Sequence, residues 1–353
     1  MRIAIRRFEQ ALLATVCILM TTLAVHGTVA AATRKSAATV AGPPLQCRGI
    51  DMLEELKSKE PDTYVRVLAD GARTENTEAM LWRIEKPGLA PSHLFGTMHV
   101  TDTRITTLSP AATAALQSAR AVLLEVADLS PQATMAAITR AAHLLMYADG
   151  RRLDTMLAAD EFAKVRSTVE KSGLPGNFAT MFRPWIVSTL LAVSDCERKN
   201  AESGHPVLDS KLAIEAKARK IPVVGLESVD SQLAAMAAVP DNEQIDMLRM
   251  ALKFADRSND MIETLTQMYL KRQMGAAMPF NLALAALAGI KADGFSGFQQ
   301  ELLLKRNHKM LDGVRPHLSE GGAFVAVGAL HLSGSDGLVK LIRDNGYTVT
   351  PVE

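Results

Sequence analysis

The sequence predicts an α/β fold: a mixed, largely parallel sheet with helical insertions. Two segments carry that prediction, because each contains an apolar run, a Gly-x-x-His turn, a helix and a second apolar run in the same order. The two turns are Gly96–His99 and Gly328–His331. Strands joined by helices of this length usually become parallel neighbours. We therefore expect two strand–GxxH–helix–strand pseudo-repeats.

The first pseudo-repeat is read from apolar runs and one helix-start signal. Ser109 before Pro110 is typical of an N-cap followed by proline at the first helical position, which predicts a helix over 111–118. Apolar periodicity predicts a helix over 52–59 ahead of it and strands over 80–84, 93–100 and 121–126.

The second pseudo-repeat comprises a strand over 323–327, a helix over 336–343 and a strand over 347–352. A further helix over 207–220 leads into a buried strand over 221–226, which ends just before Glu227. Segments 131–190 and 231–309 are rich in Ala, Leu and Met with helical periodicity, so we expect them to form the helical insertions.

The N-terminus has the pattern of an export signal. Three arginines precede an apolar stretch over 11–25, and small residues follow at 30–32. We expect a signal peptide over 1–31, a flexible leader over 32–46 and an α/β domain over 47–353, in a periplasmic or secreted protein. No later run is long and apolar enough to span a bilayer, so no integral membrane segment is expected after signal cleavage.

Charge and cysteine content narrow the partners and the compartment. Without residues 1–31, which hold three of the 39 basic and one of the 38 acidic residues, 36 basic residues face 37 acidic ones. They are scattered, which argues against a nucleic-acid partner. Cys47 and Cys196 then remain as an even pair, and in an oxidising compartment we expect a disulfide between them, with two buried thiols as the alternative.

His99 and His331 are the leading candidate site residues. Each lies where an apolar strand meets a glycine-containing turn, and ligands of open α/β sheets collect at the carboxyl ends of strands. A single histidine in such a place is more often a packed, hydrogen-bonded core residue. Two in matching contexts indicate a shared site.

Three charged residues complete the candidate set. Glu125 lies in an apolar strand, where a carboxylate is costly unless it is paired or binds a cation, although a solvent-facing strand end is the alternative. Glu227 follows another such strand, and could instead be a turn or capping carboxylate. Arg306, with Asn307, is expected on a helix over 299–308, where it could hold a substrate carboxylate or an oxyanion, or simply be exposed.

Two histidines with one or two carboxylates suit a transition metal better than Ca²⁺ or Mg²⁺. We take His99, Glu125, His331 and Glu227 as candidate ligands of Mn, Co or Zn, which would activate water for attack on a carbonyl. A metal-free site, with one histidine as general base oriented by Glu125, is the alternative.

These residues stand in motifs that resemble the TraB/GumN family and its Tiki-like metalloprotease relatives. The matching motifs are LFGTMH at 94–99, LLEV at 123–126, VLD at 207–209, GLES at 225–228 with Gln232, Arg306-Asn307, and VGALHL at 327–332 with Gly337-Leu338 and Gly346-Tyr347. The resemblance covers about residues 80–352. It implies one α/β domain with two pseudo-repeat halves, and in the Tiki relatives a divalent-metal protease that uses both Gly-x-x-His motifs and a glutamate. His99, Glu125 and His331 are the matching residues.

The resulting hypothesis is an exported metal-dependent hydrolase that cleaves an amide or peptide bond of a peptide or small-molecule substrate, with Arg306 as a further catalytic residue. The alternative is a non-enzymatic protein of the same fold that binds haem, a metal or a small ligand. The family resemblance also includes members of that kind, so activity does not follow from fold alone.

Overall fold

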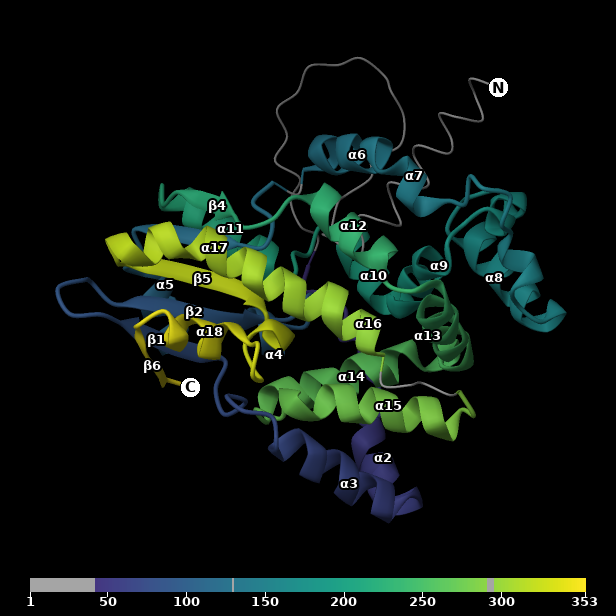
Figure 1. The fold of residues 1–353 in the computed structure, drawn as a ribbon, viewed down its shortest axis with the longest axis horizontal. Coiled ribbons are helices and arrows are strands. Elements are labelled where there is room, and N and C mark those ends of the chain that lie inside the picture. Colours follow the sequence, from purple (N-terminus) through teal and green to yellow (C-terminus); the bar gives the residue numbers. More distant parts are fainter. Residues whose placement is uncertain (1–41, 129, 291–294) are drawn as a thin grey trace.

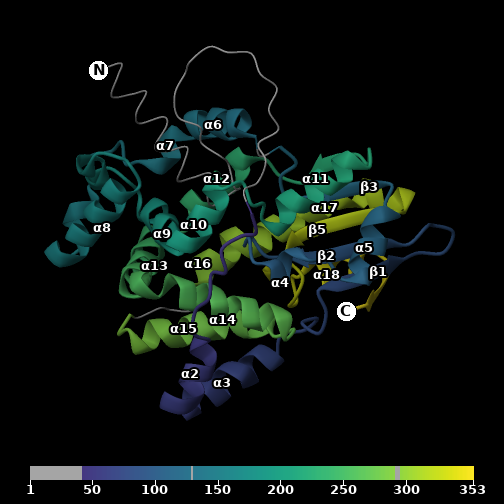
Figure 2. The ribbon, with the colours of Figure 1, turned by 180° about the vertical axis from the view of Figure 1, so that it is seen from behind.

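The computed structural model describes residues 42–128, 130–290 and 295–353. The expected signal peptide and the leader up to residue 41 lie outside this part of the chain. One sheet of six strands organises it, in the order β4-β3-β5-β2-β1-β6 (Figures 1 and 2). The strands are β1 (Leu81–Glu85), β2 (Ser92–Thr97), β3 (Ala121–Leu124), β4 (Val223–Gly225), β5 (Ala323–Gly328) and β6 (Thr348–Pro351). The predicted α/β class is confirmed.

Four neighbouring strands run parallel. β5 pairs in parallel with β2 on one side and β3 on the other, and β3 pairs in parallel with β4. β1 alone runs the other way, antiparallel to β2 and β6. The carboxyl ends of β4, β3, β5 and β2 therefore lie along one edge of the sheet, where the sequence predicted a site.

Helices cover both faces of the sheet. One face packs on α2 (Met52–Lys59), α3 (Pro61–Ala72), α5 (Pro110–Gln117), α11 (Leu208–Ala218), α14 (Ser258–Leu270) and α15 (Ala277–Leu287). The other packs on α17 (Lys305–Glu320) and α18 (Leu338–Asp344). Alternate residues of each strand enter opposite cores: Leu94 faces α17 and α18, and Phe95 faces the other layer. Each such fully buried side chain contributes about 1.5–3 kcal/mol.

The insertions form a third core beside the sheet (Figure 1). Its helices are α6 (Pro131–Arg140), α7 (Ala142–Leu145), α8 (Ala159–Lys171), α9 (Pro184–Ala192), α12 (Val229–Ala238) and α13 (Asp241–Lys253). Among the shorter helical elements are α4 (Thr103–Thr106), α10 (Asp195–Glu202), α16 (Ser296–Gln299) and η6 (Ala329–His331). No helix of the described residues is long and apolar enough to cross a membrane.

Most predicted elements agree with the structure to within two residues at each end, and two differ by more. The strand expected to reach residue 100 stops at Thr97, because the next residues leave the sheet and bind α10. The helix expected over 299–308 is α16, a π-helical segment Gln300–Leu304 and then α17, which continues to Glu320. It continues because Met310, Leu311, Val314 and Leu318 bury one of its faces.

Candidate functional site

The carboxyl edge of the sheet brings together the four residues that the strand-end pattern singled out. His99 follows β2, Glu125 follows β3, Glu227 follows β4, and His331 ends η6, directly after β5. β5 lies between β2 and β3, so the elements that carry the two histidines and Glu125 are immediate neighbours. α17 supplies Arg306, which contacts Glu125, and Asn307, which contacts His331.

His331 is buried and held by one ring nitrogen. Its Nδ1 lies 2.6 Å from Oδ1 of Asn307, whose Nδ2 donates to the carbonyl of Asp336 at 2.7 Å. Because Asn307 uses its amide N–H on Asp336, its oxygen accepts from His331, and Nδ1 carries the proton. Burial lowers the pKa of His331 to about 4, so at neutral pH Nε2 offers a free lone pair. That atom lies 3.8 Å from Oε1 of Glu125.

Glu125 is buried but fully partnered. Its Oε1 accepts from the Gly328 amide at 2.7 Å, and its Oε2 accepts from Gln232 Nε2 at 3.0 Å and Arg306 Nη2 at 2.6 Å. Burial alone would raise the pKa of Glu125, but the nearby side chains of His331, Arg306 and His99 and the Gly328 amide lower it to about 2. A buried strand-end carboxylate is therefore ionised at neutral pH, and it does not point to solvent.

Arg306 connects Glu125 with Glu227. Its Nη2 lies 2.6 Å from Glu227 Oε2, and its Nε donates to both oxygens of Glu227 at 3.2 and 3.0 Å. The Glu227 side chain is only 1% exposed. These contacts favour Glu227 as the anchor of Arg306 over Glu227 as a metal ligand. Arg306 is held by three hydrogen bonds to Glu227 and donates one to Glu125. Its guanidinium is therefore occupied by protein carboxylates, which favours a role in positioning Glu125 over direct contact with a substrate.

His99 has a different environment. Half of its side chain is exposed, and its Nδ1 lies 2.6 Å from Oδ2 of Asp209, a buried residue of α11. Thr97 Oγ1 donates to the other Asp209 oxygen at 2.8 Å. The charge of Asp209 raises the pKa of His99 to about 9, against the effect of burial. Asp209 thus fixes the ring and keeps it protonated at neutral pH, so a metal ion would have to displace the proton on Nε2.

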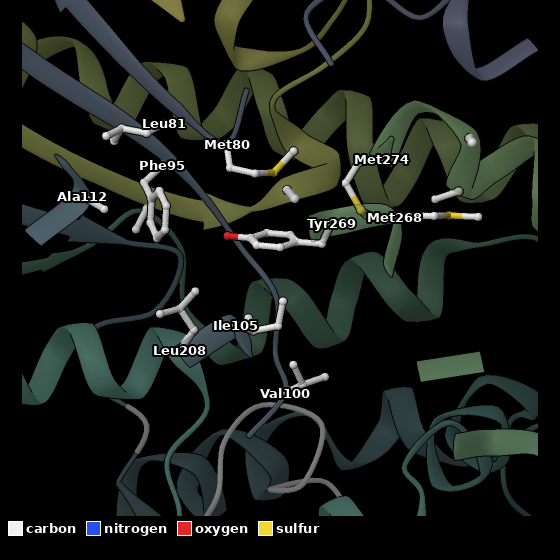
Figure 3. Close-up of a cluster of buried hydrophobic side chains, with 14 of the residues drawn as sticks. Met80, Leu81, Phe95, Val100, Ile105, Ala112, Leu208, Met268, Tyr269 and Met274 are labelled. Atoms are coloured by element: carbon white, nitrogen blue, oxygen red, sulfur yellow. The ribbon is translucent and has the colours of Figure 1, made fainter. Parts of the chain in front are cut away.

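The two Gly-x-x-His turns pack directly on each other. A Cβ added to Gly96 would lie 3.2 Å from Cα of Ala329 and 3.0 Å from Leu332 Cδ2, so any larger residue would push the second turn away by a few tenths of an ångström. The carbonyl of Gly96 also accepts from the Tyr269 hydroxyl at 2.7 Å. Figure 3 shows the Tyr269 ring between Phe95 on one side and Met268 and Met274 on the other.

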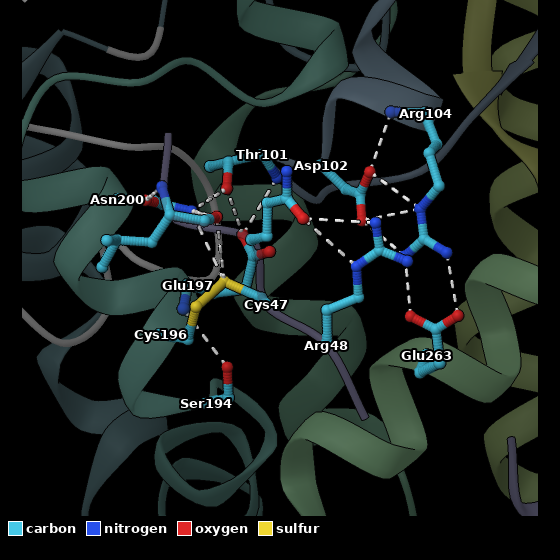
Figure 4. Close-up of a disulfide and its surroundings, with 12 residues drawn as sticks. Cys47, Arg48, Thr101, Asp102, Arg104, Ser194, Cys196, Glu197, Asn200 and Glu263 are labelled. Carbon is cyan, nitrogen blue, oxygen red and sulfur yellow. Dashed lines mark hydrogen bonds and ion pairs between the residues drawn. A yellow bond between two sulfur atoms is a disulfide. The ribbon is translucent and has the colours of Figure 1, made fainter. Parts of the chain in front are cut away.

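A disulfide supports the loop that follows His99. Cys47 and Cys196 are joined, so the N-terminal segment is tied to α10 (Figure 4). From α10, Glu197 Oε2 accepts from both the amide and the hydroxyl of Thr101 at 2.9 Å, and Asn200 Nδ2 donates to the Thr101 hydroxyl at 2.8 Å. The expected disulfide is present, and it stabilises the residues two positions beyond His99.

The donor set fits a transition metal. Both histidines are held at Nδ1 by oxygen acceptors, the arrangement typical of metal-ligating histidines. Nε2 of His331 is then ready for an ion, and Nε2 of His99 becomes so when it loses its proton. Glu125 supplies an ionised oxygen beside His331. In this conformation no three His, Cys, Asp or Glu side chains among the described residues come close enough to hold an ion. Binding would require the side chains of His99, His331 and Glu125 to converge further than they do here.

Asp209 is the main site residue that the strand-end pattern does not predict. It belongs to the VLD motif at 207–209, which by itself indicates no role for the carboxylate. A signal was present: Asp209, Leu212 and Ala216 recur at the three- and four-residue spacing of one helix face, and all three are buried. A carboxylate on the buried face of a helix requires a partner, as Glu125 did in its strand.

Comparison with known proteins gives a family and distant relatives for this chain. A protein named Metalloprotease TIKI2 of Danio rerio is 23% identical, over 78% of this chain and 61% of that protein. A Metalloprotease TIKI homolog of Nematostella vectensis is 24% identical, over 48% of this chain and 40% of that protein. The chain thus spans less than two thirds of either relative. No solved structure matches it. Residues 80–351 match the TraB/PrgY/gumN family, and the protein belongs to that family.

Proposed function

We propose that this protein is an exported, metal-dependent hydrolase that cleaves an amide or peptide bond. The observation that carries the proposal is the pair of imidazoles at the carboxyl edge of the sheet, each fixed at Nδ1 by an oxygen acceptor, beside the ionised Glu125. Distant relatives named as metalloproteases support the same reaction class.

His99, His331 and Glu125 would hold the ion. When bound, a divalent transition metal such as Mn, Co or Zn lowers the pKa of water and polarises a carbonyl. In the overall reaction the water oxygen bonds to the carbonyl carbon, the carbon–nitrogen bond breaks, and a proton passes to the leaving amine. The low pKa of Glu125 suits a ligand better than a general base, whose pKa should lie near the working pH.

The remaining site residues position this set. Asp209 and Asn307 orient the two rings, and Arg306 with Gln232 fixes one oxygen of Glu125. The Gly328 amide fixes the other oxygen. Because Gly328 is the first residue of the turn that ends at His331, the same turn holds both Glu125 and His331. The export part of the proposal is supported by the N-terminal pattern and by the disulfide.

Metal analysis of the purified protein tests the proposal. We expect about one Mn, Co or Zn per chain, and its loss in His99→Ala and in His331→Ala with the fold retained. His308→Ala is the matched control, because His308 is exposed on α17 next to Asn307. Metal-dependent cleavage in a peptide library would support the hydrolase. A protein that binds none of the three metals, or that carries haem and cleaves nothing, would contradict it.

A further inference from the structure

An apolar cavity of about 340 Å³ lies between the insertion helices and the functional edge of the sheet. Four methionines line it, namely Met247, Met250, Met261 and Met278, together with the rings of Phe254, Phe295 and Phe298. None of the described residues around it carries a charge. Flexible methionines with aromatic rings are typical of surfaces that accept apolar ligands of varied shape.

Three connections link this cavity to the candidate site. Leu330, which lines the cavity, immediately precedes His331 in the second Gly-x-x-His turn and is 37% exposed. α14, which lines the cavity with Met261, Ile262 and Leu265, also carries Tyr269, the partner of the Gly96 carbonyl in the first turn. Phe298 lies on α16, which continues through the π-helical segment into α17 and so to Arg306.

The polar groups of the cavity favour a hydrocarbon chain over a peptide. The lining contains three polar side chains, and two of them are already engaged: Ser188 Oγ donates to the Pro184 carbonyl at 3.1 Å, and Asn281 Nδ2 donates to the Ala277 carbonyl at 2.8 Å. A buried peptide segment would leave its own amides without partners, which is costly. An acyl chain has no such requirement.

We propose that the substrate carries a fatty-acyl chain and that this cavity holds the chain. An amide bond of that substrate is hydrolysed at His99, Glu125 and His331. The inference rests on the proposed function for the reaction, but the binding itself does not. It narrows the substrate class to an acylated peptide or a related amphipathic amide, with the chain inserted beside Leu330.

Binding is measured with a fluorescent fatty acid, 11-(dansylamino)undecanoic acid, displaced by unlabelled fatty acids of 8 to 16 carbons below their micelle concentrations. We expect saturable one-site binding by the full chain, with affinity rising about fourfold per added methylene until the cavity is full. Ala251→Phe, which fills the cavity, and the nearly isosteric Met261→Gln should each weaken binding about tenfold.

Two controls make the outcome specific. Leu287→Phe changes an apolar residue of α15 that is 49% exposed and does not line the cavity, and it should bind as the wild type does. His99→Ala should also retain fatty-acid binding while losing metal. Fatty-acid binding without metal would contradict the hydrolase alone. Metal binding without saturable fatty-acid binding, or cavity variants that bind like the wild type, would overturn the acyl-chain proposal alone.

Discussion

Replacement of Arg306 by methionine should destabilise the fold strongly. Arg306 is 15% exposed and lies 2.6 Å from an oxygen of Glu125 and 2.6 Å from an oxygen of Glu227, whose side chains are 9% and 1% exposed. Methionine retains much of the side-chain volume but removes the charge. Two buried carboxylates would then face each other with no cation between them.

The size of the effect follows from these contacts. Opposite charges about 4 Å apart attract by about 4 kcal/mol at an effective dielectric constant near 20. Breaking one partner of a buried ion pair usually costs about 3–5 kcal/mol, because it leaves an uncompensated buried charge. We expect Arg306→Met to lower the free energy of unfolding by that amount. Adding Glu227→Gln should restore part of the loss, since one of the two stranded charges disappears.

Urea unfolding of the wild type, both single variants and the double variant measures the coupling. Arg315→Met is the control on the same helix, because Arg315 and its partner Asp312 are 52% and 70% exposed, and it should change stability by less than about 1 kcal/mol. A loss below about 1 kcal/mol for Arg306→Met, or single-variant losses that simply add in the double variant, would refute the description of Arg306 as the link between the two carboxylates.

Three further changes test other parts of the structure. Replacing Cys47 and Cys196 by serine opens a loop of 149 residues and should cost up to about 5 kcal/mol, measured by urea unfolding; a loss below 1 kcal/mol would mean that noncovalent contacts alone hold this segment. Gly328→Ala places a Cβ 3.2 Å from Oε1 of Glu125 and should displace this carboxylate. Metal affinity should then fall about tenfold with little change in melting temperature. Unchanged affinity would show that Glu125 can move freely. Burial raises the pKa of Glu197, so the folded state binds its proton more tightly than the unfolded state does. Stability should therefore fall as pH rises from about 4.5 through the raised pKa. Glu197→Gln should remove that slope in thermal unfolding between pH 4 and 7, and a retained slope would assign it to another group.

Local patterns in the sequence were enough to predict the strands and the strand-end residues. The first four residues of the apolar run 121–126 form β3, and the cost of a carboxylate in such a run correctly identified Glu125, just after the strand, as a buried, partnered group. The same reasoning located His99 and His331, because parallel strands end at a common edge.

Contacts between distant segments were not predictable in this way. The partner of His99 comes from α11, about 110 positions along the chain, and the pairing of Arg306 with Glu227 depends on how α17 crosses the sheet. The extension of α17 to Glu320 depends on the burial of one of its faces. The sequence does not indicate this extension, because Pro316 lies inside the helix and proline usually ends one. The acyl-chain cavity is formed by five separate helices and one turn, and none of them carries a recognisable motif for it.

The position of β5 has a consequence for how the chain folds. β5 begins at Ala323, yet it occupies the middle of the sheet and joins the β3–β4 pair to the β2–β1 pair. Until those residues are synthesised, β2 and β3 each present an unpaired edge, which invites pairing with other chains. A nascent chain, or one truncated before residue 323, should therefore require protection from aggregation. The sheet and the histidine pair would then form together in one late step governed by long-range contacts.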